Sequence, residues 1–305
     1  MNEPDWNLYR TFLAVMRKGS LSAAAREVGL TQPTVGRHID ELEVQLGRSL
    51  FTRSQQGLLP TDTARALLPF AETLAATSAS LMRQLSGRAD RVEGVVRITA
   101  SEIIGVEVLP QILRHLQWDY PDLTIELSLS DSVEDLLRRE ADIAVRMTRP
   151  AQDALVARHV GEIELGLHAH PDYLERFGTP QNLADLAQHS MIGFDRKTAF
   201  IRSTAKDMQS LMPDFPSLDD IEWSYRTDSN LGQLTAIRAG LGIGICQVQL
   251  ARRAPTLQRL LPEFRFPLPT WVAMHEDLKT APRCRATFDA LVTGLRDYVT
   301  EAGRA

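Results

Sequence analysis

The sequence predicts two unlike parts: an all-α winged helix-turn-helix with a long linker helix, and after it an α/β domain. The first observation is the stretch of residues 20–50, which has the caps and apolar spacing of two short helices joined by a tight turn. The second is an apolar stripe at heptad-like spacing within residues 61–86. The third is a change near residue 95, after which β-branched strands alternate with helices.

The two short helices have clear start and stop signals. Ser20 is placed to cap the first helix, and Gly29 can take the left-handed conformation that ends it. Thr31 caps the second helix, and Pro33 falls in its first turn, where a missing N–H breaks no helical hydrogen bond. One apolar face, at spacings of four, three and four, is formed by Val35, Ile39, Leu42 and Leu46.

The other side of the second helix carries side chains that can meet DNA. Gln32, Thr34 and Arg37 lie toward its N-terminal end, as in a recognition helix that enters a major groove. Any pair of amphipathic helices would show the same apolar stripe, so an ordinary helical hairpin is the alternative interpretation.

Two flanking features favour DNA binding over a plain hairpin. A helix is predicted over residues 5–18, before the pair. After Gly47, the segment SLFTRSQQGLLPT has the pattern of two short extended pieces around a Gln-Gln-Gly turn, which is the shape of a wing. Arg48 and Arg53 are placed there to contact phosphates.

Residues 61–86 are predicted to form one long helix. Thr61 can cap it, and Pro69 inside the pattern predicts a kink. So narrow a stripe with few charges requires a partner, which is either a second subunit or the rest of the same subunit. The stripe consists of Leu67, Ala71, Leu74, Ser78, Leu81 and Leu85. The polar stretch GRADRVEG at residues 87–94 predicts a domain boundary.

Beyond this boundary the chain predicts a parallel α/β sheet. Strands are expected at residues 95–101, 121–130, 142–147, 164–170, 190–194, 242–248 and 270–275. Helices are expected at residues 106–118, 132–139, 171–177, 230–239 and 283–300. Residues 196–220 are long and irregular, and are expected to be either a lid over a cleft or a surface insertion.

Composition limits the classes of protein. The chain has 305 residues, 44% of them hydrophobic, which exceeds one typical domain and allows large cores. Its net charge of −5 excludes a generally basic nucleic-acid binder. Within residues 20–60 arginines and carboxylates balance, so non-specific attraction to phosphates is expected to be modest.

The cysteines and the N-terminus bear on location. Cys246 and Cys284 make no disulfide framework and indicate a reducing compartment. Cys246 lies in an apolar strand-like run, which favours a structural role over a redox switch. Residues 1–6 are polar and acidic, unlike a signal peptide, and no apolar run is long enough to span a membrane. We therefore expect a cytoplasmic protein without membrane contact.

Residues 6–61 resemble the DNA-binding domain of LysR-type transcriptional regulators. The positions at the family's spacings are Phe12, Ala24, Ala25, Leu30, Gln32, Pro33, Val35, Ile39, Leu42, Glu43, Leu46, Gly47, Leu50, Phe51, Arg53 and Thr61. The resemblance implies that Gln32, Pro33 and Arg37 meet DNA. One departure is Gly36, where the family commonly has Ser; glycine costs up to about 1 kcal/mol relative to alanine in a helix.

The residues expected to bind DNA lie on the second helix of the pair and in the wing that follows it. From the residues and the resemblance they are Gln32, Pro33, Thr34, Gly36, Arg37, Arg48 and Arg53. The family's pairing of subunits through the linker helix implies a dimer seam at Leu67, Leu74, Leu81 and Leu85. Since the family usually forms dimers of dimers, a homotetramer is the expectation, and a contact with RNA polymerase is allowed.

The resemblance covers nearly the whole chain, less specifically in its C-terminal part. It implies a winged helix-turn-helix at residues 1–60, a linker helix and hinge at 61–90, and an effector-binding domain at 91–305. That domain would be two α/β subdomains joined by two crossing segments, similar to periplasmic solute-binding proteins. The expected boundaries are about 92–162 with 267–301 for the first subdomain, and about 163–266 for the second.

Ligands of such sheets lie beyond the carboxyl ends of the strands, where helix N-termini point. This rule, with matching positions in the family's inducer cleft, selects Ser101, Glu102, Ser130, Arg146, Phe194, Asp228 and Ser229. Asp228 and Ser229 are equally good helix caps, and Arg146 can instead pair with Asp142. Arg146 and the helix N-termini would favour a carboxylate ligand. Four carboxylates would oppose one, so the ligand's charge stays open: Glu102, Asp131, Asp195 and Asp228.

Enzyme interpretations find little support. Gly240, Gly242 and Gly244 alternate in a strand-like run and lack both G-x-G-x-x-G and a P-loop lysine. His168 and His170 share a strand face, but no third metal ligand is indicated. No G-x-S-x-G occurs. We expect no catalytic residues, no metal and no cofactor.

The prediction is therefore a transcription factor that is switched by a small metabolite. Two subunits would present two recognition helices to a partly palindromic site on double-stranded DNA. A metabolite with different affinity for two arrangements of the assembly would switch it, as activator or repressor. The alternatives are a solute-binding module with a helical domain for protein contacts, and an enzyme acting in the cleft.

Overall fold

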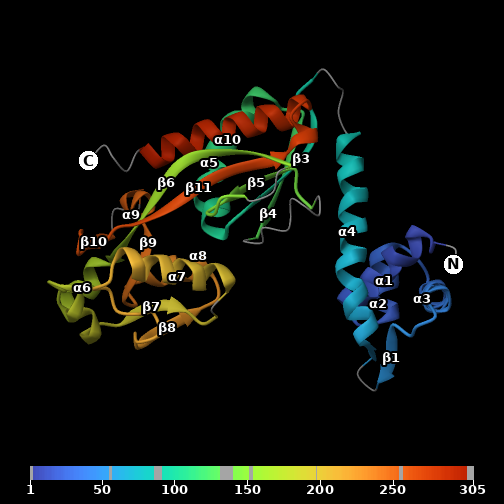
Figure 1. The fold of residues 1–305 in the computed structure, drawn as a ribbon, viewed down its shortest axis with the longest axis horizontal. Coiled ribbons are helices and arrows are strands. Elements are labelled where there is room, and N and C mark those ends of the chain that lie inside the picture. The colour runs from blue at the N-terminus through green and yellow to red at the C-terminus, as the bar shows by residue number, and fades with distance from the viewer. Residues whose placement is uncertain are drawn as a thin grey trace. The chain divides into compact units, whose positions relative to one another are not determined.

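The computed structural model describes residues 3–54, 57–85, 91–130, 140–150, 154–196, 198–253 and 257–300. These residues form two compact units, one built mainly from residues 1–82 and the other from residues 83 to 305 (Figure 1). No helix in the described ranges combines the length and the apolarity that crossing a bilayer requires.

Three helices open the first unit, and their ends follow from the sequence. They are α1 (Trp6–Lys18), α2 (Leu21–Val28) and α3 (Gln32–Leu46). The side chains of Asp5, Ser20 and Thr31 accept hydrogen bonds from backbone N–H groups in the first turns. Each helix ends at a glycine with φ between 64° and 72°, namely Gly19, Gly29 and Gly47. The caps predicted for the helix pair are confirmed.

The core of the first unit contains the predicted stripe of α3. Val35, Ile39 and Leu42 are buried against α1 and α2, and Leu46 is half-buried beside them. The hydroxyl of Thr11 and the Nδ1 atom of His38 lie 2.9 Å apart and join α1 to α3.

A short hairpin follows α3, as the wing pattern predicts. It pairs β1 (Phe51–Ser54) with β2 (Gly57–Pro60) in antiparallel register. The predicted turn residues Gln55 and Gln56 lie outside the described residues. Oε1 of Glu43 accepts hydrogen bonds from the backbone N–H groups of Leu50 at 2.6 Å and Phe51 at 3.1 Å. This carboxylate therefore orders the chain where it leaves α3 for the wing.

The long helix is α4 (Asp62–Gln84). Thr61 caps it as predicted, because its hydroxyl accepts a hydrogen bond of 3.2 Å from the N–H of Ala64. Pro69 lies inside α4, and the helix continues past it. The hydroxyl of Thr73 donates to the carbonyl of Pro69 at 2.8 Å.

The second unit is built on one mixed sheet. Its described strands are β3 (Gly94–Ala100), β4 (Leu123–Leu129), β5 (Ile143–Arg146), β6 (Leu155–Ala169), β7 (Met191–Phe194), β8 (Trp223–Thr227), β9 (Ile243–Gln247), β10 (Gln258–Leu260) and β11 (Phe266–His275). Their order is β4-β3-β5-β11-β6-β9-β7-β8, and β10 pairs with β6.

The prediction of a parallel sheet is right at the two ends of this sheet and wrong in its middle. β3 is parallel to β4 and β5, and β7 is parallel to β8 and β9. The long strands β6 and β11 run antiparallel to each other and to their outer neighbours. They are the two crossing segments that the resemblance implies, and both extend beyond the predicted residues 164–170 and 270–275.

Helices cover the sheet, and several differ from the predicted set. They are α5 (Leu109–Asp119), α6 (Pro171–Phe177), α7 (Ala199–Leu211), α8 (Asn230–Arg238), α9 (Val248–Arg253) and α10 (Pro282–Thr300). A π-helical turn, Ile104–Val108, precedes α5. The prediction that residues 196–220 are irregular is wrong for residues 199–211, because Thr198 caps α7 there, and it holds for residues 212–220. The helix expected at residues 132–139 lies outside the described residues.

Figure 1 shows α5 and α10 together on one face of the sheet, next to β6 and β11. Leu109, Leu113, Phe288 and Leu291 belong to these helices and are buried in the large core of this unit. At Gly294 a Cβ atom would lie 2.6 Å from Ile112, so glycine allows α10 to approach α5 closely.

Candidate functional site

The outer face of α3 presents the predicted DNA-binding side chains. Gln32, Pro33 and Arg37 are exposed, while Thr34 and Gly36 are half-buried. Ser22 of α2 donates a hydrogen bond of 2.8 Å to Oε1 of Gln32, which orients that amide at the N-terminus of α3. A rigid helix whose exposed N-terminal side chains include an arginine and an amide can read base edges in a major groove.

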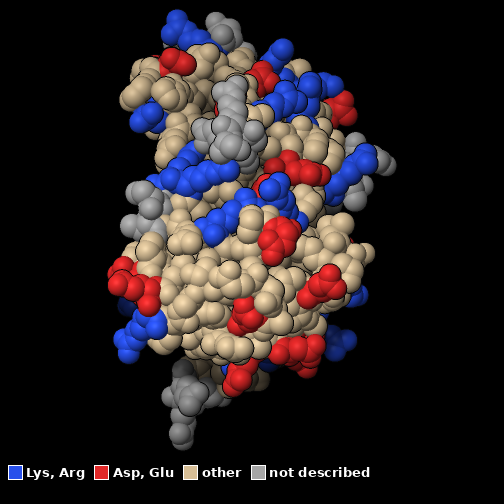
Figure 2. Space-filling view, turned by 90° about the vertical axis from the view of Figure 1, so that its left-hand side faces the viewer, with Lys and Arg blue, Asp and Glu red and all other residues tan. Residues whose placement is uncertain are grey.

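The predicted phosphate contacts flank this helix. Arg48 is exposed directly after the glycine that ends α3, and Arg53 lies in β1 of the wing. Glu27 of α2 forms ion pairs with Arg17 and Lys18 at 3.4 Å, so part of the negative charge of this unit is paired on α1. Figure 2 views the molecule from the side on which the second unit lies, and shows both basic and acidic side chains on that face.

The predicted seam of α4 is divided between two environments. Leu67 is half-buried against the core of the first unit, and Ala71 is fully buried in it. Leu74, Leu81 and Leu85 are 47%, 57% and 71% exposed. Packing within the subunit therefore accounts for the N-terminal half of α4, whereas Leu74, Leu81 and Leu85 remain uncovered within the subunit, so pairing with a second subunit stays a prediction.

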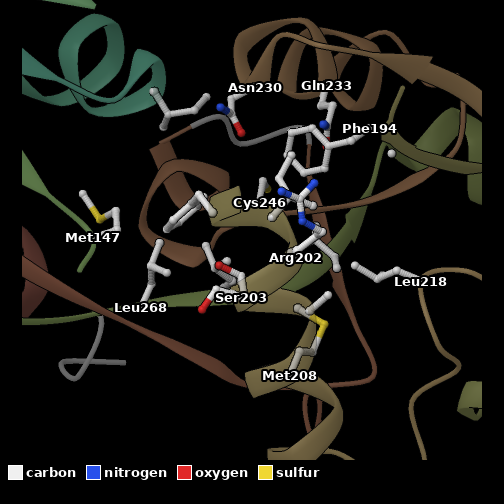
Figure 3. Close-up of a pocket in the computed structure, with 18 of the residues that line it drawn as sticks. Met147, Phe194, Arg202, Ser203, Met208, Leu218, Asn230, Gln233, Cys246 and Leu268 are labelled. Carbon is white, nitrogen blue, oxygen red and sulfur yellow. The ribbon is translucent and has the colours of Figure 1, made fainter. Parts of the chain in front are cut away.

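A cavity of about 840 Å³ lies in the second unit, at the carboxyl ends of β3, β5 and β7 (Figure 3). Ser101, Arg146 and Phe194 follow or end these three strands and line the cavity, so the strand-end rule brings them together. Residues from both ends of the sheet contribute to the lining. Met147 follows β5 and Leu268 lies in β11, while other lining residues come from α7 and α8. Its size is typical of a site for a small organic molecule.

Four other predicted effector residues lie outside the lining. Glu102 accepts hydrogen bonds from the Ser229 hydroxyl at 2.9 and 3.0 Å and from the Leu231 N–H at 3.1 Å. Ser229 also caps α8, since its hydroxyl accepts from the N–H of Gly232 at 2.9 Å. Ser229 therefore has the capping role that was the predicted alternative to ligand binding.

Asp228 and Ser130 are also set apart from the cavity. Asp228 is exposed, and its Oδ2 lies 3.9 Å from Nη1 of Arg196. The N–H of Ser130 donates to the carbonyl of Ala100 at 2.9 Å and continues the pairing of β4 with β3. Neither residue lines the cavity.

Arg146 is a buried cation at the cavity wall, with 6% of its surface exposed. Its guanidinium donates to the hydroxyl of Thr99 at 3.1 Å and to its neighbour Val145 at 3.0 Å. The alternative partner Asp142 lies at the other end of β5, where it accepts hydrogen bonds from Arg83 at 3.1 Å. Three residues of extended chain lie between Asp142 and Arg146, and the rise over these four steps of about 13 Å separates the two side chains.

One wall of the cavity was not predicted from the sequence. Residues of α7 and of the segment 215–219 line it, together with Trp223 and Gln233. The signal was present, because Thr198 is a cap, and Phe200, Met208 and Leu211 recur at helical spacing. Residues 196–220 were expected to be either a lid over the cleft or a surface insertion. Their position in the cavity wall agrees with the first of these roles.

Cys246 lines the cavity beside a buried histidine. Its Sγ atom lies 3.3 Å from Nδ1 of His168, which is also 3.0 Å from the carbonyl of Gly166. Burial lowers the pKa of His168 to about 4 and raises the pKa of Cys246 to about 12. At neutral pH both groups are uncharged, so this pair supplies neither a thiolate nucleophile nor an acid–base group.

His168 and His170, which the sequence places on one face of a strand, have separate structural roles. His168 is buried in β6, whereas Nδ1 of His170 accepts a hydrogen bond of 3.2 Å from the N–H of Asp172 at the start of α6. In the part of the chain that the structure describes, no three His, Cys, Asp or Glu side chains are grouped to hold a metal ion.

Comparisons with known proteins agree with this architecture. Residues 6–65 match the family model of the bacterial regulatory helix-turn-helix proteins, lysR family, and residues 89–296 match the LysR substrate binding domain. The probable HTH-type transcriptional regulator LtrA of Klebsiella pneumoniae is 25% identical over 292 residues, which is 92% of this chain and 91% of that protein.

Other relatives match over less of their length. An HTH-type transcriptional regulator of Xanthomonas campestris is 28% identical over 61% of this chain, and CrgA of Neisseria meningitidis is 27% identical over 60%. The matched region spans 54% of the Xanthomonas protein and 61% of CrgA, less than two thirds of either.

Solved structures share the fold. The structure of CrgA from Neisseria meningitidis has a TM-score of 0.59 at 23% identity and covers 97% of this chain and 99% of CrgA. Full-length CbnR complexed with its target DNA has a TM-score of 0.67 at 20% identity and covers 95% of this chain and 99% of CbnR. Because the two family models together account for the winged helix-turn-helix and for most of the α/β unit, the chain belongs to the LysR family of regulatory helix-turn-helix proteins.

Proposed function

We propose that the protein is a transcriptional regulator that binds double-stranded DNA and responds to a small molecule. The observation that carries the proposal is the outer face of α3, where Gln32, Pro33 and Arg37 are exposed on a helix anchored by its buried stripe. In this proposal α3 enters the major groove, and Thr34 and Gly36 lie close to the DNA. Arg48 and Arg53 contact the flanking phosphates.

Two copies of the chain would bind a partly palindromic operator. The exposed Leu74 and Leu81 on α4, together with Leu85 directly after it, form the proposed seam between subunits, with Leu67 at its margin. A homodimer presents two recognition helices to two half-sites, and a dimer of dimers would bind two such sites. Relatives include a protein named a transcriptional repressor and one named an activator, so either outcome, with or without contact to RNA polymerase, fits the proposal.

The proposed effector site is the cavity of the α/β unit. Ser101, Arg146 and Phe194 line it, while Glu102, Ser130, Asp228 and Ser229 belong to its surroundings. A ligand that binds two arrangements of the assembly with different affinity shifts their populations, and so changes how DNA is bound. This role requires no chemical conversion of the ligand.

The test is affinity selection of fragmented genomic DNA from the source organism on the purified full-length protein. Arg37→Ala is the test variant, and Arg285→Ala, which removes an exposed arginine from α10, is the matched control. We expect fragments that share an inverted repeat to be enriched by the wild type and by Arg285→Ala. Arg37→Ala should bind them about 1–3 kcal/mol more weakly.

Equal enrichment by Arg37→Ala and by the wild type would contradict the assigned role of α3. Enrichment of nothing, both with and without a pool of metabolites, would contradict regulation through DNA. In that case the solute-binding module with a protein-contacting helical domain would account for the cavity.

A further inference from the structure

We propose that the cavity binds a monocarboxylate with a bulky apolar body, such as an aromatic or branched acyl acid. The inference rests on the proposed function, since it names the chemical class of the effector. Three observations carry it: the character of the wall, an unpartnered buried donor, and the balance of charges that line the site.

The wall of the cavity is largely aromatic and aliphatic. Phe194, Phe200, Phe215 and Trp223 come from β7, α7, the segment after α7 and β8, and all four line the same space. Rings from four separate elements offer flat apolar surfaces on several sides, which suits a rigid apolar body rather than a sugar or a small polar acid. At about 840 Å³ the cavity exceeds what acetate or a short diacid would fill.

The side chain of Gln233 on α8 offers a hydrogen-bond donor to a ligand. Gln233 lines the cavity and is only 7% exposed, and its Nε2 atom is buried with no hydrogen-bond partner among the described residues. A buried amide N–H without an acceptor is unfavourable, and a ligand oxygen would satisfy it. In Figure 3 the side chains of Phe194, Arg202 and Gln233 point toward one another at one end of the cavity.

The charges at the wall favour an anion over a cation. The cationic lining residues in the described ranges are Arg146, Arg202 and Lys206, against the single carboxylate Asp219. Glu102 was expected to oppose an anionic ligand. Its carboxylate instead accepts hydrogen bonds at the N-terminus of α8. A carboxylate accepts from both guanidinium and amide donors, so it suits this end of the cavity.

The test compares three probes with one rigid apolar body: biphenyl-4-carboxylate, biphenyl-4-methanol and biphenyl-4-methylammonium. Binding to the full-length protein is measured by isothermal titration calorimetry, and acetate serves as the small-anion control. We expect the carboxylate to bind on the order of tenfold or more tightly than the alcohol. The ammonium and acetate should show no measurable binding.

Variants assign the binding to the proposed end of the cavity. Gln233→Leu should weaken biphenyl-4-carboxylate binding on the order of tenfold. Gln249→Leu is the matched control, because Gln249 is also a buried glutamine with unpartnered amide atoms but does not line the cavity. Arg202→Gln should reduce the preference for the carboxylate over the alcohol, and Arg226→Gln, an exposed arginine outside the lining, should leave it unchanged. Thermal unfolding of each variant shows that it is folded.

The outcomes separate this inference from the proposed function. Equal or tighter binding of the alcohol or the ammonium would overturn the carboxylate class, as would binding that survives both Gln233→Leu and Arg202→Gln. If no biphenyl probe binds while the DNA selection succeeds, the ligand class is wrong and the regulator stands. If the carboxylate binds as expected but no DNA is selected, the ligand class stands and the proposed function fails.

Discussion

The hydroxyl of Ser229 donates a hydrogen bond of 2.9 Å to the carboxylate of Glu102, which lies 127 residues earlier in the chain. At the other end of the same helix, Nη1 of Arg238 donates to Glu107 at 2.7 Å. The segment after β3 therefore holds α8 at both ends, and between them Asn230 faces the cavity. These two contacts therefore join the segment that follows β3 to the helix that packs against β7 and β9.

Replacing Glu102 should loosen this helix. Glu102→Ala leaves the hydroxyl of Ser229 and the N–H of Leu231 without their acceptor, which should lower the free energy of unfolding by about 1–3 kcal/mol. Urea unfolding of the full-length protein measures the change. In a double-mutant cycle with Ser229→Ala the two losses should not add. The exposed Glu276→Ala is the control, and full additivity would show that the contact contributes nothing.

Replacing Leu74 should disrupt the assembly. Leu74 is 47% exposed on α4, and Leu74→Asp would place a charge in the proposed seam, where it has no partner. Analytical ultracentrifugation should show a smaller mass than for the wild type. Phe177→Asp, a similar change at an exposed position on α6, should leave the mass unchanged. A wild-type mass for Leu74→Asp would place the interface elsewhere.

Gly36→Ala should stabilise the first unit. Gly36 is within α3, and a Cβ atom there would meet only Leu21, at 3.8 Å, so alanine fits without strain. The expected gain is up to about 1 kcal/mol from the lower conformational entropy of the unfolded chain. Chemical unfolding followed by far-ultraviolet circular dichroism measures it. Gly47→Ala is the opposite case, because φ of 64° disfavours a side chain there. A loss of stability in Gly36→Ala would contradict the open space at this position.

Asp142→Ala should be strongly destabilising. Its carboxylate accepts from Nε of Arg83 at 3.1 Å and from the N–H of Arg97 at 2.9 Å, and the Asp142 and Arg83 side chains are 3% and 9% exposed. Removing one partner of a buried ion pair leaves a buried charge, at a cost of about 3–5 kcal/mol. Asp289→Ala removes an exposed partner of Arg285 and should change stability by less than about 1 kcal/mol. Equal effects in urea unfolding would contradict the buried role of Asp142.

The stability of the second unit should fall in mild acid through His168. Burial lowers its folded-state pKa to about 4 from the usual 6.5, so between these values the unfolded chain binds more protons. Stability from this group is complete above pH 6.5 and is lost as the pH falls toward 4, by about 3 kcal/mol in all. The urea midpoint of His168→Gln should depend less on pH across this window than that of the wild type. Identical pH profiles would contradict the prediction.

Much of the first unit could be predicted because its signals are local. Caps at Ser20 and Thr31, the glycine at position 29 and the stripe of α3 each depend on residues within one or two turns, so their spacing alone specifies the helices. The same local reasoning identified the strand ends at Ser101, Arg146 and Phe194. These residues meet in space because parallel strands end at one edge of a sheet.

The remaining features depend on contacts between distant residues. Sequence alone determined the two-part organisation, the helix-turn-helix with its wing, and the strand ends that form one side of the cavity. Tertiary structure decided that β6 and β11 run antiparallel through the sheet, that α7 closes the cavity, and that Glu102 binds α8 rather than facing a ligand. The physical reason is that local propensity and periodicity act within a few residues, whereas strand direction and the choice of a carboxylate's partner depend on which distant segments pack together.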